Sequence, residues 1–477
     1  MNQLNIHSKA MYRQVLLITA LTVVSLGVSF LIANFGILIG FASVAGVIGL
    51  LVFIRTIQDV EFGFLTLVTY GYFLFLISRL IPVRIPTGVG IEIIGFIVFI
   101  GVIVNLSKNK INWELFKHPI TYLTVINEFY GILQVLNPNA VSFKGWLFAS
   151  RGIFFTFLLY FIVVKVFDNL SFIKRFTKWW LFLALCAGLY GMFQEYFGYR
   201  DFEWRYIYAS PGRYDLLSVW TGIRKFSFLS DVAAFGMLMA FSAIFTFILA
   251  LGPFKMPLKI VLVISGICML LGMSYSGTRT ATAMIPVGVM MYVLLNINNK
   301  RTIIFLVVAV IAFVGVLFGP FYNGPLERIR STFQPSEDAS MQVRDRNRKS
   351  VQPYIYSHPI GGGLMTTDEV GRELSPGHPN AGFATDSGYL ETALQRGWIG
   401  LIILLALYFT IMKTGIENFY KAKDPTIKIL YAAYCASFFS LSIANFAQSA
   451  MGQKPTGLII ISSYAILANM IRLDKKN

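Results

Sequence analysis

A short turn between two apolar stretches carries the residues best suited to bind an anion. Residues 274–279 read Ser-Tyr-Ser-Gly-Thr-Arg, and the next apolar helix is predicted to begin there. Exposed N–H groups at a helix N-terminus bind anions, and the arginine fork binds phosphate or carboxylate with two hydrogen bonds. An arginine at the positive end of a helix dipole is unfavourable unless an anion joins it. We therefore expect Arg279 to bind a substrate anion, with Ser276 beside it.

A second arginine stands at the end of the aromatic-rich segment 198–230. Arg224 is followed closely by Ser230 and Asp231, either of which can cap the helix that comes next. This places Arg224 just outside a membrane surface, where it could reach the same anion. The alternative is an interfacial arginine that only extends its head group towards water.

The large segment 320–396 holds the candidates for acid–base chemistry. A histidine or carboxylate placed against a hydroxyl group can act as its general base, and His378 and Asp386 are the two candidates. A loop histidine is more often merely solvated. We expect further substrate contacts from Arg344, Arg346, Arg348 and Tyr389.

The elements that must position these residues are membrane helices. The 477 residues are 56% hydrophobic and only 13% charged, whereas a soluble domain is about 45–50% apolar and about 25% charged. A membrane-spanning helix needs roughly 20 mainly apolar residues. The fold predicted is an all-α polytopic membrane protein with about 14 transmembrane helices and one large extracytoplasmic loop. The predicted spans lie near 15–33, 36–54, 62–80, 88–106, 119–136, 147–166, 179–197, 231–251, 258–274, 280–296, 302–319, 397–413, 428–446 and 455–471. The fifth is the weakest, because Asn127, Glu128 and Gln134 interrupt it.

The basic residues predict the orientation. With both termini in the cytoplasm, 21 of the 40 basic residues fall in short inner segments, as the positive-inside rule requires. The other 19 fall outside, and 15 of these are arginine. Topology does not explain outer arginines, whereas a phosphate- or carboxylate-bearing ligand would. Contact with lipid headgroups and ion pairs within loops are the alternative. The net charge of +17 is thus distributed as expected for a protein that contacts an anionic substrate and membrane lipids. We expect no nucleic-acid partner.

Several other chemistries find no support. The sequence has no Gly-rich nucleotide loop of the P-loop or Rossmann type, and Gly361-Gly362-Gly363 is interpreted as a turn. The three cysteines lie in apolar runs without metal-ligand spacing. We therefore expect no metal site and no cofactor.

The order of these features resembles the O-antigen ligase and O-antigen polymerase superfamily of bacterial envelopes. Its members are similar in having many helices, a short Ser-x-Ser/Gly-x-Arg turn and one large outer loop before the last helices. The ligase motif is His followed by Asn, Ser or Gln, then nine residues and Gly-x-x-Gly. Here Asp386-Ser387 is followed after nine residues by Gly397-Trp398-Ile399-Gly400. The resemblance covers about residues 200–415.

The resemblance implies roles for individual residues. Arg224 and Arg279 match the family arginines that hold a lipid pyrophosphate. Asp386 stands where ligases keep a catalytic histidine, which argues against a lipid A-core ligase and for a polymerase or another relative. His378, eight residues upstream, is the alternative base.

The predicted function is a membrane glycosyltransferase that joins a polyprenyl-pyrophosphate-linked oligosaccharide to a sugar hydroxyl on the outer face. A ligase acting on a lipid or protein acceptor and a lipid-linked glycan flippase are the alternatives. The partners expected are the glycan donor, a glycan or lipid-linked acceptor, membrane lipids, and a flippase and chain-length regulator. The predicted location is the bacterial inner membrane. The predicted parts are 1–319, with helices 1–11, the extracytoplasmic loop 320–396, and 397–477, with helices 12–14.

Overall fold

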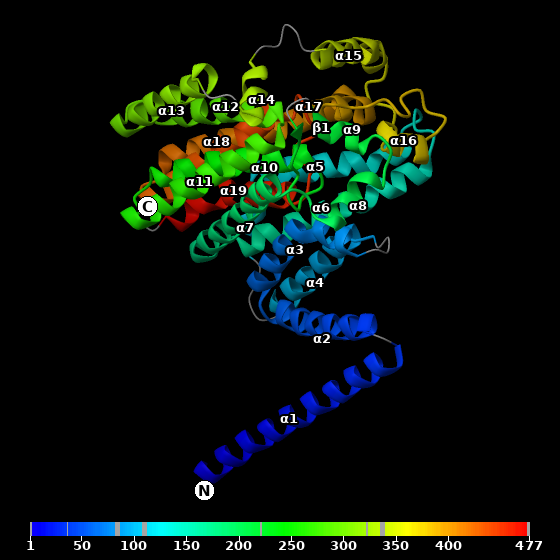
Figure 1. Cartoon of the computed structure of the whole chain (residues 1–477), viewed down its shortest axis with the longest axis vertical. Coiled ribbons are helices and arrows are strands. Elements are labelled where there is room, and N and C mark those ends of the chain that lie inside the picture. The colour runs from blue at the N-terminus through cyan, green and yellow to red at the C-terminus, as the bar shows by residue number, and fades with distance from the viewer. Residues whose placement is uncertain are drawn as a thin grey trace.

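Helices make up nearly all of the chain that the computed structural model describes, which is residues 2–35, 37–81, 86–106, 112–219, 222–320, 323–333 and 339–474 (Figure 1). A single antiparallel pair within these residues joins β1 (Ser218–Val219) to β2 (Gly222–Ile223). The helices are α1 (Asn2–Phe35), α2 (Ile37–Gln58), α3 (Val60–Leu80), α4 (Gly88–Leu106), η1 (Trp113–Phe116), α5 (Pro119–Leu133), η2 (Gln134–Leu136), α6 (Phe143–Val166), α7 (Leu170–Phe197), α8 (Asp201–Tyr208), α9 (Arg213–Leu217), α10 (Val232–Ala250), α11 (Met256–Ser276), α12 (Arg279–Leu295), α13 (Lys300–Phe318), α14 (Gly324–Ser331), α15 (Ala339–Ser357), α16 (Asp368–Leu374), α17 (Gly388–Lys421), α18 (Pro425–Ala444), α19 (Thr456–Asn469) and η4 (Met470–Leu473).

Ten helices in the described part of the chain are long and apolar enough to cross a membrane. Three shorter apolar stretches, Ile18–Asn34, Gly46–Gln58 and Arg279–Leu295, lie in α1, α2 and α12. The remaining predicted span corresponds to α5, which has only 15 residues. The prediction of an all-α protein with many candidate spans is confirmed, whereas the count of fourteen stays a prediction.

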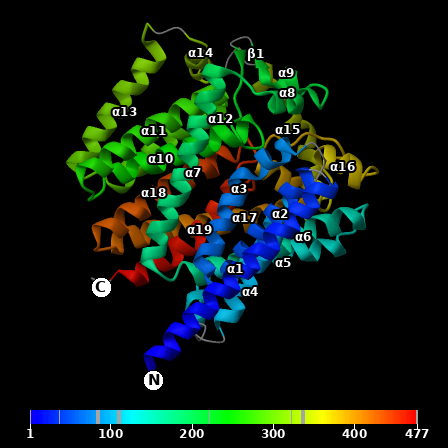
Figure 2. The same cartoon turned by 60° about the horizontal axis from the view of Figure 1, so that its bottom comes forward.

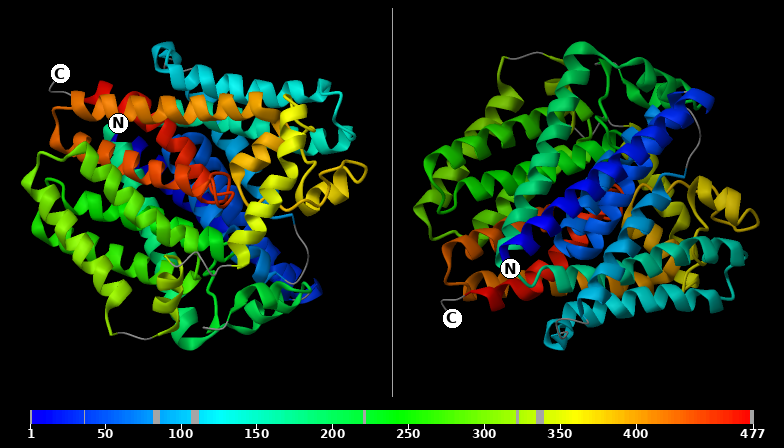
Figure 3. Two further views of the ribbon diagram at one scale, coloured as in Figure 1. Left: turned by 90° about the horizontal axis from the view of Figure 1, so that it is seen from above. Right: turned by 90° about the horizontal axis from the view of Figure 1, so that it is seen from below.

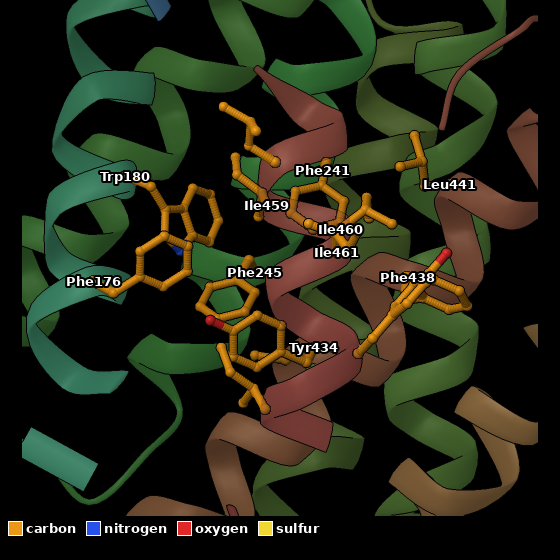
Figure 4. Packing of buried hydrophobic residues seen from close by; sticks show 14 of the residues in the cluster. Phe176, Trp180, Phe241, Phe245, Tyr434, Phe438, Leu441, Ile459, Ile460 and Ile461 are labelled. Atoms are coloured by element: carbon orange, nitrogen blue, oxygen red, sulfur yellow. The ribbon is translucent and has the colours of Figure 1, made fainter. Parts of the chain in front are cut away.

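The core lies where α7, α10, α18 and α19 meet (Figure 4). Nearly every residue of α10 is buried, as expected of a helix that is apolar on all sides. Phe245 of α10 packs against Trp180 of α7, with ring centroids 5.0 Å apart, and against Tyr434 of α18 at 4.7 Å. The helices α1 and α2 lie to one side, where α2 contacts α3 and α4 (Figure 1, Figure 2).

The bundle has two chemically different ends. At one end the α12–α13 and α17–α18 junctions meet, because the Tyr420 hydroxyl donates to the carbonyl of Leu295. We call this the lysine-rich end, since it carries Lys255, Lys300 and Lys421. The opposite, arginine-rich end holds the described segments 198–219, 222–231, 277–278, 319–320, 323–333, 339–387 and 445–455. In Figure 1 the C-terminus lies towards the first end, and α16 lies at the other; Figure 3 shows the same arrangement from above.

A break in α17 shapes the arginine-rich end. Gly397 has φ +70°, and a Cβ there would lie 1.9 Å from the carbonyl oxygen of Pro359, so only glycine fits. The carbonyls of Leu394 and Gln395, left without helical partners by the break, accept the N–H groups of Gly362 and Gly363 at 2.8 and 3.0 Å. The glycine triplet is thus a turn that supplies hydrogen bonds at the break in the helix. The break at Gly397 separates the first turns of α17 from the remainder of that helix.

Candidate active site

The turn between α11 and α12 is built around Gly277. This residue has φ +59°, in the left-handed region that glycine adopts without strain. A Cβ there would lie 2.8 Å from Arg328 Cδ and 3.4 Å from Arg224 Nε. The missing side chain therefore lets arginines from two other segments pack directly against the backbone of the turn.

Arg224 is held against this turn by two hydrogen bonds. Its Nε donates to the carbonyl of Ser276 at 2.9 Å, and its Nη2 donates to the Thr278 hydroxyl at 3.3 Å. The Tyr199 hydroxyl in turn donates to the carbonyl of Arg224 at 2.6 Å. The guanidinium is thus fixed in place and is more than an interfacial side chain extended towards water.

Arg328 of α14 is a third arginine at the same turn. Its Nη1 donates to the carbonyl of Tyr275 at 3.4 Å, and its Nη2 donates to the carbonyl of Gly222 at 3.0 Å. Burial lowers its pKa. Arg328 is one of the 15 arginines that the positive-inside pattern puts outside, but nothing in the sequence indicates that α14 folds back over the α11–α12 turn.

The positive charges of Arg224, Arg279 and Arg328 act on one another. Arg279 is the first residue of α12 and is exposed. Burial, together with the positive charges of Arg328 and Arg279, lowers the pKa of Arg224 to about 10. Three guanidinium groups that repel one another at a helix N-terminus are stabilised by a bound anion. We call residues 274–279 with Arg224 and Arg328 the arginine turn.

Ser276 shapes the arginine turn from within. Its side chain is buried, and its hydroxyl donates to the carbonyl of Met273 at 2.6 Å and accepts the N–H of Thr278 at 3.2 Å. The Thr278 hydroxyl donates to the carbonyl of Val232, which fixes the turn to α10. A Cβ at Gly236 of α10 would lie 2.3 Å from the Ser276 hydroxyl, so α10 leaves room for it.

The loop that follows Arg224 is held by Arg79 at the end of α3. The Arg79 guanidinium donates to the carbonyls of Ser227, Leu229 and Ser230, and it lies 4.4 Å from the ring centroid of Phe226. This outer arginine therefore has a structural task, as the loop-contact alternative predicts. The helix cap beyond it is Asp231, whose carboxylate accepts the N–H groups of Ala233 and Ala234 at 2.8 and 2.9 Å.

Asp386 and Arg344 form a second group. Arg344 Nε of α15 lies 3.5 Å from Asp386 Oδ2, and both side chains are partly exposed. Asp386 precedes Ser387, the N-cap of α17, whose hydroxyl accepts the N–H of Leu390. The carboxylate therefore stands at the start of α17, within reach of solvent and beside a cation.

The neighbours of this pair anchor it to the end of α18. Arg348 Nη2 donates to the carbonyl of Phe446 at 3.0 Å, and its guanidinium lies 4.2 Å from the ring centroid of that residue. The Tyr389 hydroxyl donates to the carbonyl of Ser442 at 2.7 Å. Arg346 is exposed on α15 between them. Arg348 and Tyr389 thus have local partners, while Arg346 faces solvent.

His378 is buried, with a 5% exposed side chain. Its Nδ1 accepts the N–H of Asn380 at 3.1 Å, and its Nε2 lies 3.0 Å from the hydroxyl of Tyr354. An acceptor at Nδ1 leaves the proton of the neutral ring on Nε2, facing Tyr354. Burial lowers the pKa of His378, and the neighbouring His358 adds to this effect.

The two groups lie at the same end of the bundle. The Tyr420–Leu295 contact joins the far ends of α17 and α12, so these helices run in the same direction. The start of α12 with Arg279 and the start of α17, just after Asp386, therefore both lie at the arginine-rich end. Among the described residues, no group of three or more His, Cys, Asp or Glu side chains is arranged to hold a metal ion.

The comparison with known families falls on this end of the molecule. Residues 264–405 match the family model described as O-antigen ligase. The matched region includes the turn with Arg279, the helix with Arg328, and the segment from Asp386 to Gly400, whereas Arg224 precedes it. No curated protein matches the chain.

The apolar helices and the family match together define a multi-pass membrane protein that processes glycans. The match covers residues 264–405, less than a third of the chain, and supports the O-antigen ligase and O-antigen polymerase superfamily. The resemblance inferred from the sequence is thereby confirmed.

Proposed function

We propose that the protein is a polymerase of O-antigen or exopolysaccharide type. It joins an oligosaccharide carried on polyprenyl pyrophosphate to a sugar hydroxyl of another lipid-linked glycan. The observation that carries this proposal is the arginine turn, where Arg224, Arg279 and Arg328 converge on one helix N-terminus.

The arginine turn binds the pyrophosphate of the donor. A pyrophosphate supplies several anionic oxygens, which match several guanidinium forks and the N–H groups of the first turn of α12. The same groups stabilise the negative charge that grows on the leaving pyrophosphate as the glycosidic bond to it breaks. They are already in place before the reaction, since Arg224 and Arg328 are hydrogen-bonded to the turn.

The chemical step exchanges one bond for another at the anomeric carbon of the donor. The acceptor oxygen forms a bond to this carbon, and the bond from the carbon to the pyrophosphate oxygen breaks. Polyprenyl pyrophosphate leaves with the electron pair, and the acceptor hydroxyl proton passes to the general base. No metal or cofactor is needed for this balance.

Asp386 is the better candidate for the base. Its carboxylate is partly exposed at the start of α17, and Arg344 holds it in position. The ring nitrogens of His378 are both engaged, by the Asn380 N–H and the Tyr354 hydroxyl, and its side chain is buried. In this proposal His378 supports the fold of the segment that carries Asp386.

The reaction takes place on the extracytoplasmic face of the bacterial inner membrane. The lysine-rich end then faces the cytoplasm, in agreement with the positive-inside rule, and the arginine-rich end faces outwards. The proposed arrangement has fourteen spans, with 1–319 and 397–477 in the membrane and 320–396 as the outer loop. A flippase would deliver the donor, and a chain-length regulator would limit the product.

A ligase that transfers the glycan to a lipid or protein acceptor is the second candidate. The description of the matching family model as O-antigen ligase favours it. The aspartate at position 386, where ligases carry histidine, favours the polymerase. The acceptor decides between the two, because the donor and the leaving group are the same.

The test is transfer from a polyprenyl-pyrophosphate glycan by the purified full-length protein. Arg224→Ala and Arg279→Ala should each lose most of the activity while eluting as folded protein in size-exclusion chromatography. Arg372→Ala, at an exposed arginine paired with Glu369, is the matched control and should stay active. Near-normal transfer by well-folded Arg224→Ala and Arg279→Ala would rule out the proposed pyrophosphate site and favour a transporter.

A further inference from the structure

A cavity of about 720 Å³ lies beside the start of α17, within the range of about 300–1,000 Å³ that is typical of ligand sites. Its walls come from α3, α4, α5, α6, α17 and α19 and from the segment before α19. Gly88 and Met365 line it at the arginine-rich end, and Tyr408 and Tyr464 line it deeper in the bundle. The arginine turn contributes none of the lining residues.

Six charged side chains line this cavity. Three are carboxylates and three are cations, so their formal charges cancel; they are Glu92, Glu128, Glu391, Arg151, Arg396 and Lys454. Charged groups between membrane helices are costly and are typically kept for function. The sequence shows Glu128 only as an interruption of the fifth predicted span, and the structure shows that this interruption faces the cavity.

Among the described residues, only two of these six charges form a direct ion pair with each other, although Arg396 also attracts Glu128 and Glu391 at longer range. Arg151 and Glu92 form an ion pair at 3.0 Å, which joins α6 to α4. Glu128 and Glu391 instead accept hydrogen bonds from neutral donors, the Asn127 amide at 2.9 Å and the Ser449 hydroxyl at 3.1 Å.

Among these six residues, Lys454 gives the clearest indication of a ligand. Among the described residues its ammonium group forms no hydrogen bond and no ion pair, and it lies 5.8 Å from the ring centroid of Phe155. Burial lowers its pKa, while Glu92 opposes this shift. An ammonium group left without acceptors in a hollow has three donors to offer to a ligand.

This lining selects a ligand rich in hydroxyl groups. A bare anion would meet three carboxylates, and a bare cation would meet three cations. An acyl chain would give none of the six charges a partner, and such burial is costly. A sugar both donates and accepts hydrogen bonds at each hydroxyl, and its apolar face packs on aromatic rings such as Tyr408 and Tyr464.

The cavity is joined to the proposed general base by one helix face. Gly388, Glu391, Thr392, Gln395 and Arg396 all line it, with the spacing of residues that share one side of a helix. Asp386 lies just before Gly388. A sugar in the cavity would therefore extend towards Asp386.

We propose that this cavity binds the saccharide of the acceptor, with Glu128, Glu391, Arg396 and Lys454 hydrogen-bonding its hydroxyl groups. The inference rests on the proposed function, because that function defines which saccharide is the acceptor. It adds a site that is separate from the arginine turn and that recognises sugar instead of pyrophosphate.

The experiment measures protection of a cysteine placed in the cavity. Thr392→Cys is introduced into the full-length protein after Cys186, Cys268 and Cys435 are replaced by Ala, and its rate of labelling by a water-soluble maleimide is followed. The probe ligand is the free oligosaccharide released by mild acid from the producing cell's lipid-linked glycan, so it carries no pyrophosphate.

The free oligosaccharide should slow labelling at position 392, and equally so when Arg224→Ala is added. Lys454→Gln and Glu128→Gln should each weaken this protection about tenfold or more, because a charged hydrogen-bond partner is lost. Lys144→Gln, at an exposed lysine of the same end, should not. Glu373→Cys, outside the cavity, reports on non-specific effects and should label at an unchanged rate.

Two results would overturn the inference. One is unchanged labelling at position 392 up to the solubility limit of the sugar. The other is protection by the intact lipid-linked glycan alone that disappears with Arg224→Ala, which would make the cavity part of the donor site. Neither measurement needs catalysis, so loss of transfer in the arginine variants is judged separately from sugar binding.

Discussion

Arg344 Nε lies 3.5 Å from Asp386 Oδ2 and so joins α15 to the residue before the N-cap of α17. The pair places a partly exposed carboxylate beside a cation at the arginine-rich end. A carboxylate in this position can accept the proton of an incoming hydroxyl.

Replacing Asp386 by Asn keeps the shape of the side chain and removes its basicity. If Asp386 is the general base, turnover should fall by roughly 10²–10⁴-fold while the KM for the donor stays the same. Steady-state kinetics of glycan transfer by the purified protein measure both quantities. Glu373→Gln, at an exposed carboxylate of the same end, is the control. A loss of only a few-fold in Asp386→Asn would show that the base is elsewhere.

Arginine-to-lysine changes separate charge from geometry at the arginine turn. Arg279→Lys and Arg328→Lys keep the positive charge but lose the planar fork that binds two phosphate oxygens. Each should therefore lose most of the transfer activity, whereas Arg372→Lys should retain it. Binding of a polyprenyl pyrophosphate without sugar, followed by native mass spectrometry, should weaken in parallel. Full activity in Arg279→Lys would mean that only its charge matters.

The break in α17 should be sensitive to a single methyl group. Gly397→Ala puts a Cβ against the Pro359 carbonyl at positive φ, and it should destabilise the protein by about 1–3 kcal/mol or more. Gly315→Ala in α13 meets nothing within 4 Å and should be neutral or mildly stabilising. Thermal unfolding of both variants in the same detergent makes the comparison. Equal melting temperatures would contradict the packing described for Gly397.

Acidification should destabilise the segment around His378. Its lowered pKa means that the folded state holds the neutral ring, whereas the unfolded chain takes up a proton near its ordinary pKa of about 6.5. Stability is thus fully present above this pH and falls as the pH drops below it. The melting temperature should decrease from pH 7 to pH 5, and less steeply in His378→Gln. The difference between the two proteins isolates His378 from His118, whose pKa is also lowered by burial. Parallel slopes would show that His378 titrates as it does in water.

The proposed orientation is tested by labelling in whole cells. Glu373→Cys lies exposed at the arginine-rich end, and Lys421→Cys lies exposed at the other. An impermeant maleimide should label position 373 in intact cells and position 421 only after lysis. The reverse pattern would invert the topology.

The sequence predicted the helical class and the arginine of the α11–α12 turn, because both depend on local patterns. Apolar runs indicate helices directly, and Gly277, two residues before Arg279, indicates a tight turn at a helix start. Arg328 could not be singled out, since its place depends on how α14 packs against α11 and α12. Arg79 is an outer arginine for which the sequence suggests a ligand, but its buried contacts show that it holds a loop in place.

The charged cavity could not be predicted for a related reason. Its residues are spread from Glu92 to Lys454, and no spacing in the sequence links them. In the sequence, Gly397 and Gly400 stand out only because their spacing resembles the family motif. The structure explains Gly397 by the approach of the Pro359 backbone, a contact between segments that are far apart along the chain.

The hydrogen bonds that fill the break in α17 attach one part of the outer segment to the membrane helices. Residues 359–363 bond to α17 through Gly362 and Gly363, and the carbonyls of Ile360 and Gly361 accept the Asn137 amide at 3.1 Å. Lifting this part would expose several unpaired backbone groups at once, so it moves as one body with α17. On the other side of His358, α15 packs against α17, and its side chains Arg344 and Arg348 contact Asp386 and the end of α18. The backbone bonds after His358 should therefore make amide hydrogen exchange slow at Gly362 and Gly363.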